Sequence, residues 1–304
     1  MNSILLSVTA AGSASLANLS YRKYSTSNGD ATSPNGYLLV FYFFSFLTSL
    51  IFYPEVFTQK PNYIVLAIGA LVGVLNVSLM LLTSKALTKG PSGLTFAIQN
   101  TSAVFPGLLL FFFFGSDFGF SFSFMQCAGV ALVLAGLFLG VRGDNNDQEK
   151  TSKTWLIYAF ACFFVQIVAL TLIQARCVLF ECEGKDVFFS FLSVNRAEDI
   201  WFMPGLFGMG TFLQSIFFAC EKRGFSKAEV SFGLLGGLFN FGSTCLLLLA
   251  TKFAVPSEKA ILFPCFAVST IVFCNAWANR LYHEDFKLAS TALCGLGIFI
   301  GILA

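Results

Sequence analysis

Long apolar segments separated by short polar or charged breaks recur along the whole chain. A helix that crosses a bilayer needs about 20 predominantly apolar residues. Ten segments reach or approach that length, at residues 3–21, 37–57, 63–86, 93–114, 121–141, 154–175, 201–220, 228–250, 258–279 and 287–304. None of them has the alternating pattern of a membrane β-strand. The pattern therefore predicts an all-α integral membrane protein with ten transmembrane helices.

The breaks divide the predicted helices into two groups of five. The most polar break separates the fifth helix from the sixth. We expect a first five-helix unit at residues 1–142, a polar linker at 143–153 and a second unit at 154–304. The longest break, Arg176–Ile200, is itself half apolar. An extension of the sixth helix, a helix lying at the membrane interface and an ordinary loop all remain open for it.

An internal repeat links the two units. Residues 69–76 and residues 233–240 both follow the pattern Gly-x-x-x-Gly-x-x-Asn, and Pro-Ser follows each at nearly the same interval. Gly-x-x-x-Gly also recurs near the ends of the fifth and tenth predicted helices. Matches in the same order predict a duplicated unit. An odd number of helices per unit turns the second copy upside down, which is the architecture of many secondary transporters.

Composition supports a membrane protein and narrows its function. Hydrophobic residues make up 56% of the chain and charged residues 11%, whereas a soluble protein carries roughly 25% charged residues. A net charge of +2 without a basic cluster argues against nucleic-acid binding. The spans hold no paired carboxylates, His-rich set or Ser/His arrangement. We therefore predict no enzyme, cofactor or metal site, and we expect the nine cysteines to be packing residues.

Two stretches of the chain resemble a known transporter family. Residues 85–100, Lys-Ala-Leu-Thr-Lys-Gly-Pro-Ser-Gly-Leu-Thr-Phe-Ala-Ile-Gln-Asn, with Gln-Cys-Ala-Gly-Val-Ala-Leu-Val-Leu-Ala-Gly at 126–136, resemble the EamA-type drug/metabolite transporter repeat. The second half resembles it from Ala250 to Ala304, although Gly-Ser-Asp at 115–117 departs from the family's usual Glu-containing link. The resemblance implies a ten-helix carrier with a central cavity lined by both halves. It implies no particular substrate.

Polar side chains inside the predicted spans are costly in lipid and therefore mark candidate binding residues. Asn76 and Asn240 lead, because they occupy equivalent places in the repeat; contact with a polar substrate and bonding between helices both remain open. The other substrate-binding candidates are Gln99, Asn100, Gln166, Gln174, Asn18, Asn275 and Trp277. Glu258 and Lys259 begin the ninth helix, where Glu258 either suits the positive helix end or acts with Lys259 as a gate or a contact for substrate charge.

These candidates predict a carrier that moves a small organic metabolite by alternating access. Amides, hydroxyls and aromatic rings, with Trp155, Trp201 and Trp277 available, suit a neutral, zwitterionic or mildly cationic solute. Examples are an amino acid, an amine or a sulfonium such as S-adenosylmethionine. The expected partners are this metabolite and the lipid bilayer, and the chain is expected to be a monomer or a homodimer. A non-transporting partner subunit or a lipid translocator of the same fold is the alternative.

The orientation in the membrane stays open at this stage. Ten helices put both termini on one side, which the resemblance implies is the cytoplasm, in a bacterial cytoplasmic membrane. The positive-inside rule disagrees, because most Lys and Arg residues would then fall in external links. Segment 3–21 has no preceding Lys or Arg, which favours a membrane helix over a secretory signal. A cleaved signal would change the parity.

Overall fold

The computed structural model describes residues 2–27, 33–90, 92–115, 123–142, 153–180, 194–254, 256–282 and 288–302. Nearly all of these residues are helical. The α-helices are α1 (Ser3–Ser27), α2 (Asn35–Phe52), α3 (Tyr63–Leu87), α4 (Ser92–Thr101), α5 (Phe105–Phe114), α6 (Phe124–Arg142), α7 (Lys153–Leu179), α8 (Phe202–Cys220), α9 (Lys227–Phe253), α10 (Pro256–Tyr282) and α11 (Leu288–Ile302). Short 3₁₀ helices are η1 (Pro54–Phe57), η2 (Ser102–Val104) and η5 (Arg196–Trp201).

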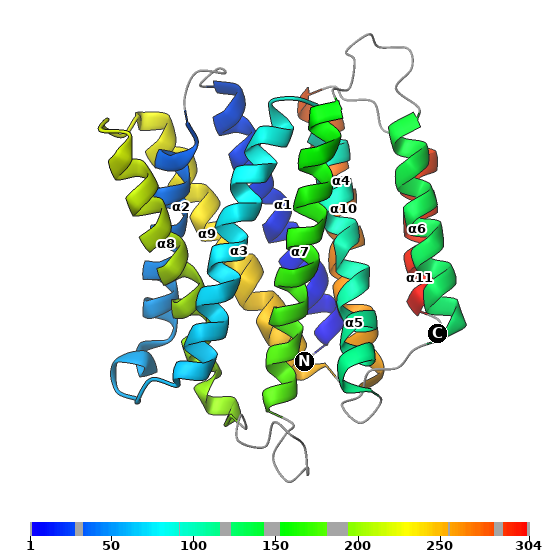
Figure 1. The fold of residues 1–304 in the computed structure, drawn as a ribbon, viewed down its shortest axis with the longest axis horizontal. Coiled ribbons are helices and arrows are strands. Elements are labelled where there is room, and N and C mark those ends of the chain that lie inside the picture. Colours follow the sequence, from blue (N-terminus) through cyan, green and yellow to red (C-terminus); the bar gives the residue numbers. More distant parts are fainter. Residues whose placement is uncertain are drawn as a thin grey trace.

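The helices form one bundle in which they run roughly along a common axis (Figure 1). Within the described residues, seven helices are long and apolar enough to cross a membrane. Large apolar side chains point outward, and Ile51, Phe112 and Phe124 are 80%, 82% and 86% exposed. A surface this apolar suits lipid and not water. The prediction of an all-α, multi-pass membrane protein is confirmed. We call the end of the bundle that holds Ser3 the termini end and the opposite end the far end.

Some predicted helix boundaries were wrong. α2 ends at Phe52 and not at residue 57, because Pro54 begins a separate 3₁₀ turn. The predicted helix 93–114 is divided into α4, η2 and α5. Pro106 lies in the first turn of α5 and lacks the N–H that a continuous helix would donate to Ser102. α1 runs to Ser27, six positions past its predicted end at residue 21, and its last turns include the buried Tyr24.

The long break at Arg176–Ile200 is partly helical. α7 continues through Arg176 to Leu179, which supports the extension of the sixth helix, and η5 leads into α8. The apolar stretch Val187–Leu192, considered as an interfacial helix, lies outside the described residues. So does most of the predicted polar linker, at residues 143–152.

Glycines on α3 bring its backbone into contact with α8. A Cβ atom at Gly69 would collide with the carbonyl oxygen of Phe202, and one at Gly73 would collide with the carbonyl oxygen of Leu206. Membrane helices associate through such close packing, because lipid supplies no hydrophobic force to press them together. The first Gly-x-x-x-Gly motif therefore forms the α3–α8 contact.

The second motif does the same on α9 against α2. A Cβ atom at Gly233 would lie 3.0 Å from the carbonyl oxygen of Tyr37, and one at Gly237 would lie 2.6 Å from that of Phe41. In both contacts the two carbonyls are four residues apart and thus lie on one helix face. The repeat that was visible in the sequence is therefore used twice for the same kind of helix contact.

Serine hydroxyls of α1 attach it to helices of the second half. They donate hydrogen bonds of 2.7–2.9 Å to backbone carbonyl oxygens, from Ser7 to Leu262, from Ser13 to Phe239 and from Ser20 to Phe232. Ala10 and Ala11, on the same helix, are fully buried. The Ala/Ser-rich composition of this first segment thus serves close contact with α9 and α10.

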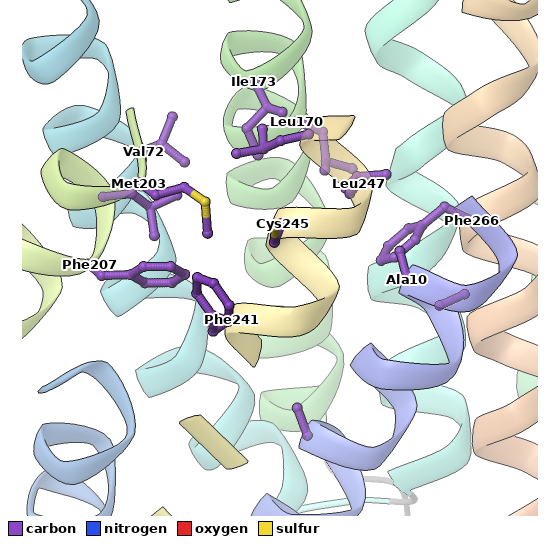
Figure 2. Close-up of a cluster of buried hydrophobic side chains, with 14 of the residues drawn as sticks. Ala10, Val72, Leu170, Ile173, Met203, Phe207, Phe241, Cys245, Leu247 and Phe266 are labelled. Carbon is purple, nitrogen blue, oxygen red and sulfur yellow. The ribbon is translucent and has the colours of Figure 1, made fainter. Parts of the chain in front are cut away.

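Both halves of the chain build the same apolar core (Figure 2). Met203 and Phe207 of α8 lie close to Phe241 of α9, and Val72 of α3 and Leu170 of α7 belong to the same cluster. Because these side chains come from residues on either side of the predicted linker, neither predicted unit would bury its apolar face alone.

Substitution of the contact glycines tests this packing. We expect Gly73→Ala and Gly237→Ala each to destabilise the folded protein by about 1–3 kcal/mol, because the added methyl group meets a backbone carbonyl that cannot rotate away. Gly107→Ala is the matched control, since nothing lies within 4 Å of its Cβ position. Unfolding of the purified proteins by titration with denaturing detergent measures the difference. Equal stability of all three variants would contradict the packing.

Candidate functional site

The two leading candidates differ in their surroundings. Asn240 of α9 is half-buried, and its amide donates a hydrogen bond of 3.3 Å to the hydroxyl of Ser45 on α2. Asn76 of α3 is also half-buried, but it makes no side-chain hydrogen bond within the described part of the chain. Tyr37 of α2 and Phe202 of α8 hold equivalent positions, because each presents its carbonyl oxygen to the first glycine of a motif. By the same offset, Gly210 of α8 is the equivalent of Ser45, and glycine has no hydroxyl that could bond to Asn76. Asn76 therefore keeps its amide available for another group.

The candidates on α4 are held by their own surroundings. Gln99 accepts a hydrogen bond of 3.2 Å from Thr83 of α3, and the Thr83 hydroxyl also lies 3.6 Å from the sulfur of Cys162 on α7. Asn100 is buried and donates to the carbonyl oxygen of Phe96, one turn earlier in α4. Gln99 thus lies where α3, α4 and α7 meet, whereas Asn100 bonds within its own helix.

The remaining predicted residues are spread over α1, α7 and α10. The amide of Asn18 is 3.7 Å from the sulfur of Cys274 on α10. Gln174 is buried, while Gln166, Asn275 and Trp277 are half-buried. Within the described part of the chain, the indole N–H of Trp277 has no hydrogen-bond partner. The predicted set therefore faces several helix contacts, and the described bonds do not join it into one cluster.

The two predicted gating residues lie in the first turn of α10. The carboxylate of Glu258 accepts a hydrogen bond of 2.7 Å from the hydroxyl of Ser3, so that it ties the start of α10 to the start of α1. The acid also suits the positive end of the helix dipole. The side chain of Lys259 lies outside the described residues.

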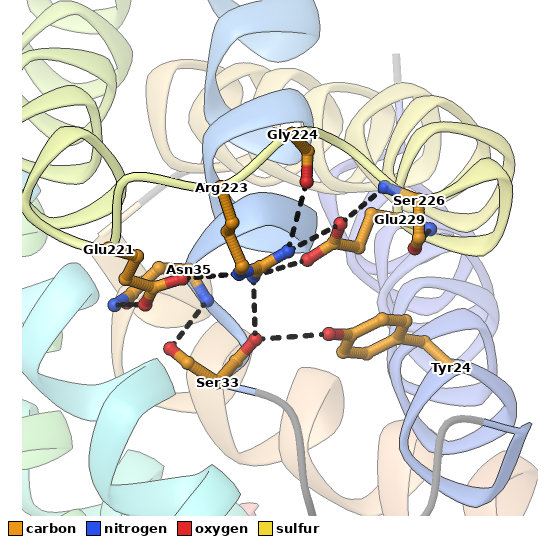
Figure 3. Close-up of polar contacts among 8 residues, drawn as sticks. All are labelled: Tyr24, Ser33, Asn35, Glu221, Arg223, Gly224, Ser226 and Glu229. Carbon is orange, nitrogen blue, oxygen red and sulfur yellow. Dashed lines mark hydrogen bonds and ion pairs between the residues drawn. The ribbon is translucent and has the colours of Figure 1, made fainter.

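A polar network at the far end was not predicted as a site. We call it the far-end network (Figure 3); its members are Tyr24, Ser33, Asn35, Glu221, Arg223, Gly224, Ser226 and Glu229. Arg223 forms ion pairs of 2.7 Å with Glu221 and with Glu229. Arg223 also donates to the carbonyl oxygens of Ser33 and Gly224. This one guanidinium thus connects the end of α8 and the start of α9 to Ser33, which lies just before α2.

The surrounding residues complete the far-end network. Ser226 and Glu229 form a capping box, in which the Ser226 hydroxyl accepts from the Glu229 N–H and the Glu229 carboxylate accepts from the Ser226 N–H. Asn35 donates to Glu221 at 2.6 Å. A Cβ atom at Gly36 would collide with the Glu229 carboxylate. The absence of a side chain at Gly36 therefore leaves room for the buried carboxylate of Glu229 against α2.

Hydrogen bonding sets the ionisation of the far-end network. Burial opposes the charge on Glu221, but hydrogen bonds from Ser33, Asn35 and Arg223 outweigh it and hold the pKa of Glu221 below its ordinary value of 4.5. Hydrogen bonding to Glu229 raises the pKa of Arg223 despite desolvation. Both groups are therefore charged at neutral pH.

A second charged group lies at the termini end. The guanidinium of Arg176, in the last turn of α7, is fully buried, and its Nε lies 2.8 Å from Oδ1 of Asp199 in η5. Its Nη2 donates to the hydroxyl of Thr251 on α9 at 3.4 Å, and its central carbon lies 4.7 Å from the centre of the Phe202 ring. Beside it, Asn62 donates to Glu198 at 2.6 Å. We call Asn62, Arg176, Glu198, Asp199 and Thr251 the termini-end cluster.

Sequence reasoning missed both charged groups because their members flank the spans. Ser-Lys-Ala-Glu at 226–229, directly before an apolar run, is a capping-box pattern, and it was the available signal for Glu229. Arg176 follows an apolar run, and Glu198 and Asp199 precede the next one. Opposite charges at the facing ends of consecutive spans were thus visible, but their contact requires the fold.

The described residues hold no evident metal site. No three His, Cys, Asp or Glu side chains gather there as a metal ion would require. The cysteines whose side chains are described carry free thiols. The chemistry of these sites is therefore hydrogen bonding and charge pairing.

Comparison with known proteins supports the fold and gives no information on the function. No protein-family model matches the chain, and no curated protein matches it. A solved structure described only as "Crystal structure of protein" is similar over 99% of this chain and 94% of its own, with a TM-score of 0.63 and 12% sequence identity. At that identity the likeness shows a shared fold alone, and it covers nearly the whole length of both chains.

Acid should weaken the far-end network. A carboxyl group whose folded-state pKa is lowered contributes stability above its unfolded-state pKa and loses it as the pH falls through the folded-state value. We expect Glu221→Gln to cost about 1–2 kcal/mol near pH 7 and to flatten the loss of stability below about pH 4.5. Glu55→Gln, at an exposed acid, is the control. If the difference in melting temperature between wild type and Glu221→Gln were the same at every pH, the stabilising role assigned to the Glu221 carboxylate would be contradicted.

Proposed function

We propose that this protein is a secondary transporter of the EamA type. In this proposal α1, α2, α3, the interrupted element from α4 to α5, and α6 form one five-crossing repeat. α7 to α11 form the second repeat, inverted with respect to the first. The carrier moves a small neutral, zwitterionic or mildly cationic metabolite by alternating access. Its natural place is a cytoplasmic membrane.

The helix pairing supports an exchangeable pair of repeats. α3 packs on α8 and α7, while their counterparts α9, α2 and α1 pack on one another in the same way. α1 contacts α10 as α7 contacts α4 and α5. Three further contacts, α2 with α8, α4 with α10 and α6 with α11, join counterparts across the proposed axis. Exchanging the repeats thus returns these larger contacts.

The glycine contacts carry the proposal furthest. Gly69 and Gly73 meet the carbonyls of Phe202 and Leu206, and their repeat counterparts meet carbonyls at corresponding positions of α2. A coincidence of composition would not reproduce the partner carbonyls as well as the glycines. This equivalence is what inverted repeats of one ancestral unit produce.

The two ends of the bundle also correspond. The far-end network joins the end of α1, the start of α2, the end of α8 and the start of α9. The termini-end cluster joins the end of α7, the segment that starts α8 and the start of α3. These are counterparts when the repeats are exchanged. Alternating access needs a closure at each end that can open while the other stays closed, and these two groups are suited to that role.

Transport is tested by uptake into sealed vesicles that contain only the purified protein. Labelled amino acids, amines and S-adenosylmethionine are offered with and without the same unlabelled solute inside, because exchange requires no added ion gradient. We expect at least one solute to accumulate faster than in protein-free vesicles. Absence of uptake for the whole panel would favour the partner-subunit or lipid-translocator alternative.

The two asparagines should separate binding from packing. Asn240→Ala removes the bond to Ser45, so we expect a stability loss of about 0.6–1.7 kcal/mol together with slower uptake. Asn76→Ala removes no described bond, and we expect unchanged stability with uptake about tenfold slower. Gln59→Ala, at an exposed amide between α2 and α3, is the control. Normal uptake by both variants would make these residues packing groups.

A further inference from the structure

We propose that Arg176 and Asp199 bind the charged ends of a zwitterionic solute, with the carboxylate of the solute on Arg176 and its ammonium group on Asp199. This inference rests on the proposed transport function and names the class of substrate. It places one solute-binding position at the termini end, formed by the last turn of α7, by η5 and by α9.

Unmet hydrogen-bonding capacity is the first observation. The Arg176 side chain is fully buried, yet its Nη1 has no hydrogen-bond partner among the described residues. Its Nε is close to Asp199 without hydrogen-bond alignment, and Oδ1 of Asp199 likewise lacks a hydrogen bond. Buried polar groups in folded proteins are almost always bonded. A cation and an anion that are both left incomplete at one place therefore indicate a missing polar partner.

The geometry of the guanidinium is the second observation. Asp199 lies on the Nε side, and the Phe202 ring lies beneath the guanidinium. Thr251 accepts one long hydrogen bond of 3.4 Å from Nη2. Nη1 is therefore the terminal nitrogen left without a bond by the described residues, and Nη2 beside it makes only the bond to Thr251. Two parallel N–H groups on the edge formed by these two nitrogens match the two oxygens of a carboxylate, which is the pairing for which arginine is best suited.

Charge balance selects a zwitterion over a simple anion. Arg176 and Asp199 already neutralise each other, so a bound carboxylate alone would leave a net negative charge in a desolvated place. A solute that also carries an ammonium group supplies one opposite charge to each residue. The Asp199 side chain is 12% exposed, although its Oδ1 is buried, so the solute would have to reach the exposed part of this side chain. An α-amino acid has both charges within this short span.

The test measures binding by thermal shift of the full-length purified protein. The probes are the twenty L-amino acids, offered singly. For the best of them, the methyl ester lacks the negative charge and the deaminated acid lacks the positive charge. We expect the amino acid to raise the melting temperature and both analogues to bind about tenfold more weakly or worse. Glycerophosphoethanolamine is included because a lipid headgroup carries the same two charges.

Variants distinguish binding from a purely structural ion pair. Arg176→Lys keeps the charge but loses the fork, so we expect about tenfold weaker amino-acid binding with unchanged binding of the methyl ester. Asp199→Asn should weaken the amino acid and spare the deaminated acid. Lys252→Met, an exposed lysine of α9, is the control and should bind as wild type. A structural role alone would lower the melting temperature without changing this selectivity.

The outcomes separate this inference from the transport proposal. If Arg176→Lys and wild type distinguish amino acid from ester equally, or if only glycerophosphoethanolamine binds, the solute position assigned to Arg176 is wrong. If vesicle uptake succeeds for a solute without a carboxylate and no amino acid binds, the inference fails while transport stands. If no solute is taken up at all, the transport proposal fails, whatever binds to Arg176.

Discussion

Contact between glycine faces and backbone carbonyls is the constraint on which the rest of this bundle depends. Lipid does not press apolar helices together, so their association relies on close packing and on hydrogen bonds between helices. α3 meets α8, and α9 meets α2, at separations that exclude even one methyl group at Gly73 or Gly237. This fixes the rotation and the height of four helices at once. The asparagine three residues beyond each motif, Asn76 or Asn240, is thereby placed at the edge of the same contact.

The same contacts explain why the halves of the chain are interleaved. α1 and α2 pack on α9 of the second half, and α7 and α8 pack on α3 of the first. Each packed group therefore contains helices from both halves, and the core of Figure 2 is shared. A movement of one half of the chain as a rigid unit would break the α3–α8 and α2–α9 glycine contacts, because each of them joins the two halves. A movement of α1, α2 and α9 against α3, α7 and α8 would preserve them and would change mainly the α2–α8 contact.

Hydropathy located most spans because a membrane helix needs about 20 consecutive apolar residues, which the local sequence shows directly. The duplicated Gly-x-x-x-Gly-x-x-Asn pattern likewise predicted close contacts, since glycine on a membrane helix has few other uses. The pattern could not say which carbonyl each glycine meets. Nor could it separate Asn76 from Asn240, because the difference lies in the partner helix, where one has Ser45 and the other Gly210. Arg176 was not predicted as a site residue because its spatial neighbours Asp199 and Thr251 are distant from it in the chain.

The two ends of the bundle differ in how completely their arginines are bonded, and this difference affects which end opens more easily. Every nitrogen of the Arg223 guanidinium donates, to Glu221, Glu229 or backbone carbonyls. Two of the hydrogen bonds at the far end join the start of α2 to the turn after α8, from Arg223 to the carbonyl oxygen of Ser33 and from Asn35 to Glu221, so separation of α2 from α8 there must break two charged hydrogen bonds. At the termini end, Arg176 crosses to α9 only through the long bond to Thr251. Hydrogen bonds to charged groups are worth about 1.5–3 kcal/mol each, so the far end is the more firmly closed of the two. A solute that satisfies Arg176 would add bonds at the end that is held less firmly, and its binding energy would then be available to close that end.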